Sequence, residues 1–158
     1  MKLAITGHRP NKLGNDYDLK SPLTKAIENR LQQIVNELNP TLMISGMALG
    51  IDTLWAQLAL KNGIDLLAAI PFKGQEITWP EKSQRLYHYI LDQAKYIVYV
   101  SEGSYSAYKM QVRNIWMVEE CDKLVAVWDG TSGGTKNCVE YADGKKEIII
   151  VNPKDYKP

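Results

Sequence analysis

Short apolar runs alternate with longer amphipathic stretches from one end of the chain to the other, and this alternation limits the possible folds more than any other feature. Strands are expected at residues 2–6, 41–45, 65–72, 95–101, 123–128 and 147–152. Helices are expected between them, at residues 22–38, 51–61, 80–94 and 110–122, with one more beginning near Gly134. Strands joined through helices of this length form right-handed crossovers. The sequence therefore predicts an α/β fold, a Rossmann-like three-layer sandwich with a mostly parallel sheet of about six strands and helices on both faces.

The length of 158 residues fits one domain, expected to cover residues 1–152, with residues 153–158 as a solvated C-terminal tail. The sequence has no apolar run of the ~18 residues that a membrane span needs, and its first residues do not read as a signal peptide. We therefore expect a cytoplasmic protein without a membrane partner. Cys121, Cys138, His8 and His88 lie in no metal-ligand spacing, so we expect neither a metal site nor a cofactor.

The charges of the chain are nearly balanced, with 19 Lys and Arg against 18 Asp and Glu and a net charge of +1. General nucleic-acid binders carry a clear basic excess, because neutralising phosphates supplies most of their affinity. We therefore expect nucleic acid to be an unlikely partner, although a local basic groove stays possible.

Most of the glycines and unusual polar residues come directly after the expected strands. The segments are TGHRP, SGMALGID, PFKGQ, SEGSY and WDGTSGG. Ligands of open parallel sheets bind beyond the carboxyl ends of the strands. These segments are therefore predicted to gather along one rim and to form a ligand site there.

Bare backbone in these segments suits a phosphate group. Gly46 and Gly50 precede one helix, and Gly133, Gly134 and Thr135 begin another. Free amides at the positive end of a helix bind anions. A plain strand-to-helix turn rarely needs the three glycines of WDGTSGG, which favours a ligand over a simple tight turn.

Side chains in the same segments are candidates for the rest of the site. Arg9 offers a planar fork for phosphate, and Asp52 is assigned to a ribose hydroxyl because a carboxylate repels a phosphate. Each candidate taken alone also fits an ordinary core or surface role. The other candidates are Gly7 for close backbone approach, His8 for an anionic or aromatic ligand, Phe72 with its neighbour Pro71, of which Phe72 could flank a base, the polar set Gln111, Arg113 and Asn114, then Asp129, Asn137 and Glu140, the last as the candidate catalytic carboxylate.

The motifs ITGHRP, SGMALGID, PFKGQ and SGGT, with the stretch that ends in LVAVWDG, together resemble the YpsA-like branch of the SLOG superfamily. That superfamily also includes the LOG phosphoribohydrolases and the Rossmann domain of DprA. The resemblance covers roughly residues 1–151. It implies a Rossmann-like domain that binds a nucleotide or a nucleotide-derived ligand such as NAD or ADP-ribose, between SGMALG and TSGGT. Related domains often pair, so a homodimer or a higher homo-oligomer is expected.

Three functions follow from these patterns. The first is a binding protein that senses or sequesters its nucleotide-type ligand. The second is an N-glycosidase of the LOG type, in which Glu140 or Asp129 would act on the glycosidic bond. LOG enzymes carry a P-G-G-x-G-T-x-x-E motif, whereas here Glu140 follows Thr135 by five residues, which favours binding over hydrolysis. The third is single-stranded DNA binding in the manner of DprA.

Overall fold

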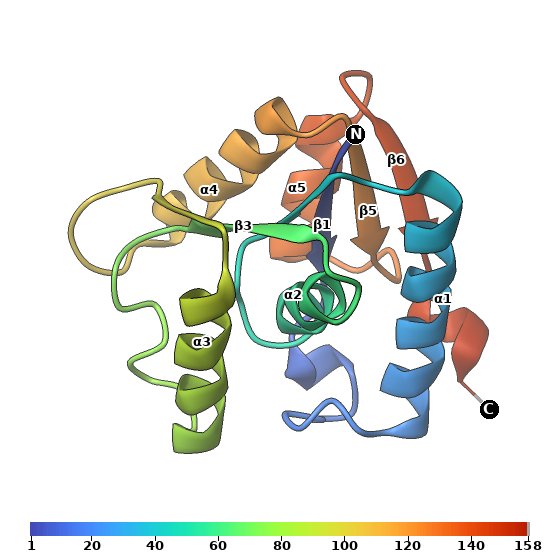
Figure 1. The fold of residues 1–158 in the computed structure, drawn as a ribbon, viewed down its shortest axis with the longest axis horizontal. Coiled ribbons are helices and arrows are strands. Elements are labelled where there is room, and N and C mark those ends of the chain that lie inside the picture. Colours follow the sequence, from blue (N-terminus) through green and yellow to red (C-terminus); the bar gives the residue numbers. More distant parts are fainter. Residues whose placement is uncertain (158) are drawn as a thin grey trace.

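A parallel β-sheet forms the middle layer of the computed structural model, which describes residues 1–157 (Figure 1). Within those residues the sheet has six strands in the order β4-β3-β2-β1-β5-β6, and every neighbouring pair is parallel. The predicted Rossmann-like sandwich is therefore confirmed. The strands are β1 (Lys2–Gly7), β2 (Leu42–Ser45), β3 (Asp65–Ile70), β4 (Tyr96–Tyr99), β5 (Lys123–Val127) and β6 (Glu147–Val151).

Helices cover both faces of the sheet. The apolar side chains of alternate strand residues divide between two cores: Leu3 and Ile5 of β1 point to the first, and Ala4 points to the second. The first core lies under α1 (Pro22–Leu38), α2 (Ile51–Lys61) and α3 (Glu81–Gln93), and the second under α4 (Ala107–Glu120) and α5 (Gly134–Ala142). No helix within residues 1–157 is long and apolar enough to cross a membrane.

The direction of the chain reverses at β1, and this reversal positions the site. From β1 the chain moves outward through β2, β3 and β4, then returns to place β5 on the other side of β1. Loops that leave β1 and β5 therefore run in opposite directions and open a crevice beyond the carboxyl ends of these two strands. In Figure 1 the blue segment that follows β1 lies beyond these strand ends.

Apart from strand ends that shift by one or two residues, two segments differ from the sequence-based expectations. Helix α4 begins at Ala107, three residues before the expected start at Met110. The prediction missed this first turn because it is mostly exposed and carries no apolar periodicity. Residues 153–156, expected in a solvated tail, form a 3-10 helix (η2, Pro153–Tyr156). Pro153 is buried and Tyr156 packs against the first core, so these residues extend the layer beside α1.

Candidate functional site

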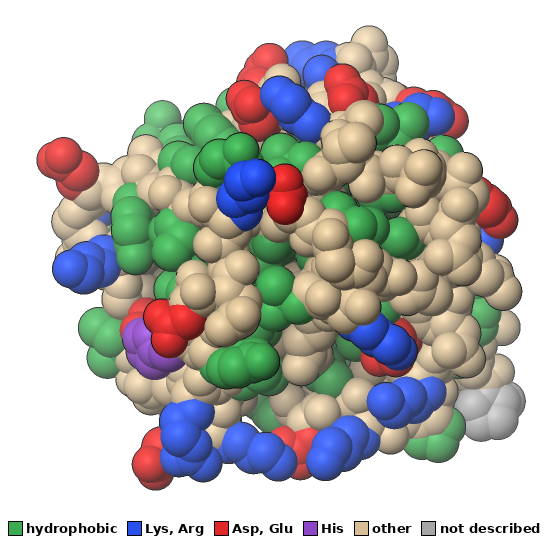
Figure 2. All heavy atoms as spheres, in the orientation of Figure 1, with side chains coloured by type: hydrophobic (Ala, Val, Ile, Leu, Met, Phe, Trp, Pro, Cys, Tyr) green, Lys and Arg blue, Asp and Glu red, His purple; other side chains and the backbone are tan. Residues whose placement is uncertain are grey.

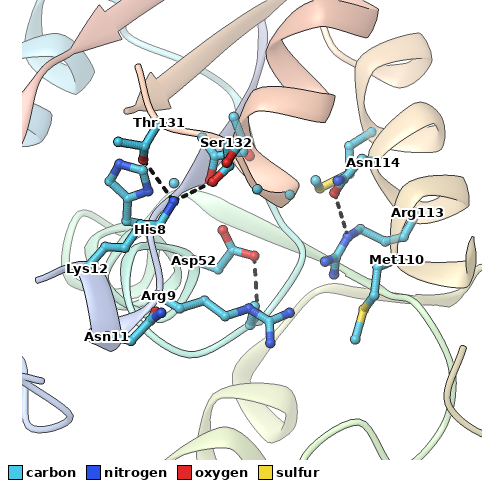
Figure 3. Close-up of a pocket in the computed structure, with 17 residues that line it drawn as sticks. His8, Arg9, Asn11, Lys12, Asp52, Met110, Arg113, Asn114, Thr131 and Ser132 are labelled. Atoms are coloured by element: carbon cyan, nitrogen blue, oxygen red, sulfur yellow. Dashed lines mark hydrogen bonds between the residues drawn. The ribbon is translucent and has the colours of Figure 1, made fainter. Parts of the chain in front are cut away.

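A hollow of about 250 Å³ opens in the crevice between β1 and β5 (Figure 3). Three segments form most of its wall: the turn after β1, the loop between β5 and α5, and the inner face of α4. The start of α2 closes the floor. The lining residues are Thr6, Gly7, His8, Arg9, Asn11, Lys12, Ala48, Asp52, Met110, Arg113, Asn114, Met117, Thr131, Ser132, Gly133, Gly134 and Thr135. We call this hollow the main pocket.

The start of α5 presents bare backbone to the main pocket. Gly133 is the N-cap residue, and it makes no side-chain cap hydrogen bond. The first amides of a helix have no partner within the helix, so here they are left for solvent or a ligand. A Cβ atom added at Gly134 would meet nothing within 4 Å, which shows that open space lies over this turn. The geometry suits an anion.

The loop that carries these glycines is held from both sides. Lys12 Nζ donates hydrogen bonds to Thr131 Oγ1 at 2.8 Å and to the Ser132 carbonyl at 2.6 Å. Asp129 Oδ1 accepts from the Thr131 amide at 3.0 Å and from the Thr131 hydroxyl at 2.6 Å. Desolvation opposes ionisation of Asp129, but the Thr131 hydrogen bonds and His8 outweigh it and lower the pKa of this carboxyl well below its usual range. Asp129 therefore acts as a fixed negative anchor for the loop.

His8 joins the turn after β1 to the same loop. Its side chain is buried, and its Nε2 accepts the Asp129 amide at 3.1 Å and lies 3.0 Å from Asp129 Oδ1. Burial lowers the pKa of His8 below 6.5, against the opposing effect of Asp129. Through these contacts with the amide and the carboxylate of Asp129, His8 fixes the loop against the turn after β1.

Two buried charges of opposite sign line the main pocket, Asp52 from the start of α2 and Arg113 from α4. Arg113 is 4% exposed and Asp52 is 6% exposed. Arg113 Nη1 donates to the Gly46 carbonyl at 2.6 Å, and its Nε donates to Asn114 Oδ1 at 3.1 Å. Asp52 Oδ2 accepts the Ala48 amide at 3.2 Å. Figure 3 shows both side chains reaching toward the same space from opposite walls, with Arg9 below Asp52.

Burial and mutual attraction act in opposite directions on this pair. Burial raises the pKa of Asp52, and Arg113 and the Ala48 amide oppose the rise. Burial lowers the pKa of Arg113, and Asp52 opposes the fall. Each charge thus stabilises the other in a site that water reaches poorly. A ligand with a hydroxyl and an anionic group would find a partner for each here.

The structure brings nine of the predicted site residues into the lining of the main pocket. They come from four separate segments of the chain, as the rim prediction requires. They are Gly7, His8, Arg9, Asp52, Arg113, Asn114, Gly133, Gly134 and Thr135.

Two predicted glycines lie just behind the lining instead. A Cβ at Gly46 would stand 2.4 Å from Arg113 Nη1, and one at Gly50 would stand 2.6 Å from the His8 carbonyl oxygen. These glycines make room for the protein's own atoms, not for a ligand. Asp129 also lies behind the lining, as the loop anchor described above.

The other predicted residues lie farther from the main pocket. Pro71 and Phe72 are buried, and Phe72 packs edge-on against Tyr105. Gln111 accepts a hydrogen bond from Asn114 at 3.4 Å, and Asn137 is exposed on α5. The side chain of Glu140 is 63% exposed and lies 3.5 Å from Lys136 Nζ.

Sequence reasoning missed several lining residues, and Lys12 is the most important of them. It lies two residues beyond the TGHRP segment, which ends at Pro10, and the local pattern did not distinguish it from a surface lysine. The sequence analysis also missed Asn11, which lies beside Lys12, and Thr131 and Ser132, which lie within the WDGTSGG segment. Met110 and Met117 line the wall with Arg113 because positions three and four apart share a helix face.

Comparison with known proteins shows the family to which this chain belongs. A family model described as YspA SLOG family, named YpsA, matches residues 3–149. The chain belongs to this family. The SPbeta prophage-derived protein YoqJ of Bacillus subtilis (strain 168) is 33% identical over 144 residues, which covers 78% of this chain and 84% of YoqJ. A UPF0398 protein of Bacillus cereus (strain B4264) is 31% identical over 156 residues, which covers 92% of this chain and 84% of the relative.

Solved structures of DNA processing protein A (DprA) share the fold of this YpsA-family chain. The Streptococcus pneumoniae protein superposes with a TM-score of 0.61 at 23% identity, and the Helicobacter pylori protein with a TM-score of 0.66 at 18% identity. The alignments cover 94% and 95% of this chain. They cover only 49% of the pneumococcal chain and 64% of the H. pylori chain, so this chain corresponds to part of each.

This comparison corrects the prediction that nucleic acid is an unlikely partner. The H. pylori structure, which has this fold, is described for its single-stranded DNA binding mode. The prediction was wrong because it relied on the net charge of +1, which averages over the whole surface. Here Arg9, Lys12 and Arg113 line one pocket whose one carboxylate, among the described residues, is Asp52.

Proposed function

We propose that this YpsA-family protein binds a phosphate-bearing nucleotide or nucleotide derivative, such as an ADP-ribose-like compound, and that binding serves to sense or sequester it. The observation that supports this most directly is the uncapped start of α5, which faces open space beside three cationic side chains. Helix N-termini with bare glycine backbone are anion sites, and Arg and Lys strengthen them.

The two walls of the main pocket suit different parts of such a ligand. The amides of Gly134 and Thr135, with Lys12 Nζ, suit a phosphate. Asp52 lies across the pocket and would accept a hydrogen bond from a ribose hydroxyl. The volume of about 250 Å³ lies below the ~300 Å³ at which sites for whole drug-sized ligands begin. The pocket therefore fits a sugar phosphate, and the remainder of the ligand would extend outside it.

Calorimetry with AMP, ADP-ribose and adenosine tests the proposal. We expect AMP and ADP-ribose to bind and adenosine, which lacks phosphate, to bind at least tenfold more weakly. Gly134→Val should abolish AMP binding while preserving the fold, because open space surrounds this position and a side chain would occupy the place of the phosphate. Asp143→Ala, at the far end of α5, is the matched control and should bind AMP like the wild type. Equal affinity of wild type and Gly134→Val for AMP would reject this placement.

The glycosidase alternative has its own test. Incubation with nucleoside monophosphates or NAD, followed by chromatography, detects a released base. We expect none, because Glu140 is exposed on α5 and lies outside the pocket lining. Base release that Glu140→Gln removes would reverse this expectation and assign the bond cleavage to Glu140.

Single-stranded DNA is a second candidate ligand, and the shared fold of H. pylori DprA favours it. The phosphate site proposed above would serve a strand as well as a mononucleotide. A gel shift with single-stranded oligonucleotides at low and high salt tests this candidate, since phosphate contacts weaken as salt rises.

A further inference from the structure

A second hollow lies beside the main pocket. It has a volume of about 230 Å³ and opens between the 13–21 loop, the start of α2 and the start of α3. The residues that line it include one aromatic residue, two leucines and two lysines: Tyr17, Leu49, Leu86, Lys20 and Lys82. We call it the side groove.

The two hollows share one dividing segment, residues 48–53. Ala48 and Asp52 line the main pocket, whereas Leu49, Gly50 and Thr53 line the side groove. Gly50 packs against the turn after β1 so closely that an added Cβ would lie 3.0 Å from Arg9 Cα. The two hollows are therefore neighbours, and a chain-like ligand that bound in both would cross over Arg9 and Gly50.

Positive charge continues from one hollow to the other. Within the described residues, their combined lining holds five Lys or Arg side chains and two carboxylates, although the whole chain has almost equal numbers of each. Figure 2 shows several lysine and arginine side chains, with acidic side chains among them, along the lower edge of the molecule. The five cations are Arg9, Lys12, Arg113, Lys20 and Lys82, and the carboxylates are Asp52 and Asp18.

The side groove also offers a surface for a base. Tyr17 is 45% exposed, and Leu49 and Leu86 are half-buried beside it. Lys82 Nζ lies 3.1 Å from Asp18 Oδ1, but both side chains are more than half exposed, so this ion pair is weak and exchanges readily for a phosphate. Aromatic side chains next to cations are the usual elements of single-strand binding sites.

The 13–21 loop is firmly held, so the groove is preformed. The Asp16 carboxylate accepts hydrogen bonds from the Ser21 amide at 2.8 Å, the Thr24 hydroxyl at 2.8 Å and the Lys20 amide at 3.2 Å. Leu19, in the same loop, is 6% exposed and belongs to the first core. The backbone around Tyr17 and Lys20 is thereby fixed to the start of α1.

We infer that the side groove is a second nucleotide subsite, which binds the next residue of a single-stranded DNA whose terminal phosphate occupies the main pocket. This inference rests on the proposed phosphate site. Tyr17 would stack on a base, and Lys20 and Lys82 would contact the phosphodiester that links the two nucleotides.

Fluorescence anisotropy with a 5′-phosphorylated hexathymidylate, beside calorimetry with thymidine 5′-monophosphate, tests the inference. We expect the wild type to bind the hexamer at least tenfold more tightly than the monophosphate. Tyr17→Ala should weaken hexamer binding about tenfold, the loss of one stacking contact. Lys82→Ala should reduce the slope of log K against log salt by about 0.7, the value for one phosphate contact on a single strand.

Both variants should bind the monophosphate like the wild type. Lys95→Ala is the matched control for Lys82→Ala. Lys95 also forms an exposed ion pair, 3.3 Å from Asp65, but it lies at the amino ends of the strands, and its loss should leave hexamer binding and the salt slope unchanged.

The outcomes separate the two proposals. Hexamer binding no tighter than monophosphate binding, or unaffected by Tyr17→Ala and Lys82→Ala, would overturn the second subsite and leave the proposed function intact. Failure of the wild type to bind either thymidine 5′-monophosphate or AMP would overturn the proposed function. Hexamer binding that still depended on Tyr17 and Lys82 would then support a strand site in the side groove, and no binding of either ligand would overturn both.

Discussion

Gly50 and Gly134 lack a side chain for different physical reasons, and alanine substitution distinguishes them. Gly50 has a φ of +88°, and an added Cβ would lie 2.6 Å from a backbone oxygen that cannot move cheaply. We expect Gly50→Ala to lower the free energy of unfolding by about 2–3 kcal/mol. Gly134→Ala should change it by less than about 0.5 kcal/mol, because its surroundings are open. Urea denaturation measures both, and equal losses would contradict the distinction.

Arg113 is the residue on which the floor of the main pocket most depends. Arg113→Met would leave the buried Asp52 carboxylate without its compensating charge, and we expect a loss of about 3 kcal/mol of folding free energy at pH 7. Without Arg113 the pKa of Asp52 rises further above its value in the unfolded chain. A carboxyl group with a raised folded pKa stabilises the protein below its unfolded pKa and loses that contribution as pH rises through the folded pKa.

The deficit of Arg113→Met should therefore be smaller near pH 4 than at pH 7. Denaturation curves of both proteins at the two pH values measure this difference. A deficit that stays constant with pH would mean that packing, and not the Asp52 charge, accounts for the loss.

At the scale of the element, Asp16 fixes the start of α1. Three hydrogen bonds to Ser21, Thr24 and Lys20 outweigh desolvation and lower the pKa of Asp16 to about 2. A depressed carboxyl pKa contributes stability above the unfolded pKa of about 3.8 and loses it as pH falls toward 2. We expect Asp16→Asn to lose about 1 kcal/mol at pH 7, as a lost cap does. The difference from wild type, followed by thermal unfolding, should disappear as pH falls from 4 to 2, and a difference that persists there would contradict the assignment.

Helix and strand signals predicted most of the elements, and the exceptions have physical causes. Ser21 and Pro22 marked the start of α1, and the Ser21 hydroxyl does accept the Thr24 amide. The first turn of α4 and the helix η2 gave no periodic signal, because one is exposed and the other has only four residues. The periodicity of α5 also bears on Glu140: Thr135, Cys138, Val139 and Ala142 are buried, so Glu140 falls on the outer face.

The sequence predicted where the site lies, but it did not predict most of the contacts within the site. Strand ends and glycines located the rim, since parallel strands bring their carboxyl ends together. The sequence could not show what lies above each glycine, so Gly46 and Gly50 were assigned to a ligand although Arg113 and His8 occupy that space. The role of Lys12 depends on contact with a loop some 120 residues away, which no local pattern reports.

At the scale of the whole molecule, the two cysteines report on the integrity of the second core. Cys121 and Cys138 are 1% and 0% exposed, and burial raises their pKa values to about 11 and about 12. Neither thiol should react with Ellman's reagent at pH 8 in the native protein, because thiolate and access are both lacking. Both should react once the protein unfolds in denaturant. Rapid stoichiometric labelling without denaturant would show that this core opens easily.

Because all strands of the sheet are parallel, the pocket lies at one end of the sheet and the turns that lead into the strands lie at the other. Turns that lead into strands, such as those at Asn62–Gly63 and Gly144–Lys145, lie at the amino end of the sheet. A six-residue strand such as β1 spans about 20 Å, so these turns are about that far from the pocket. A tether attached there would anchor the protein to a sensor surface with its pocket facing the solution, and immobilisation would not compete with the ligand.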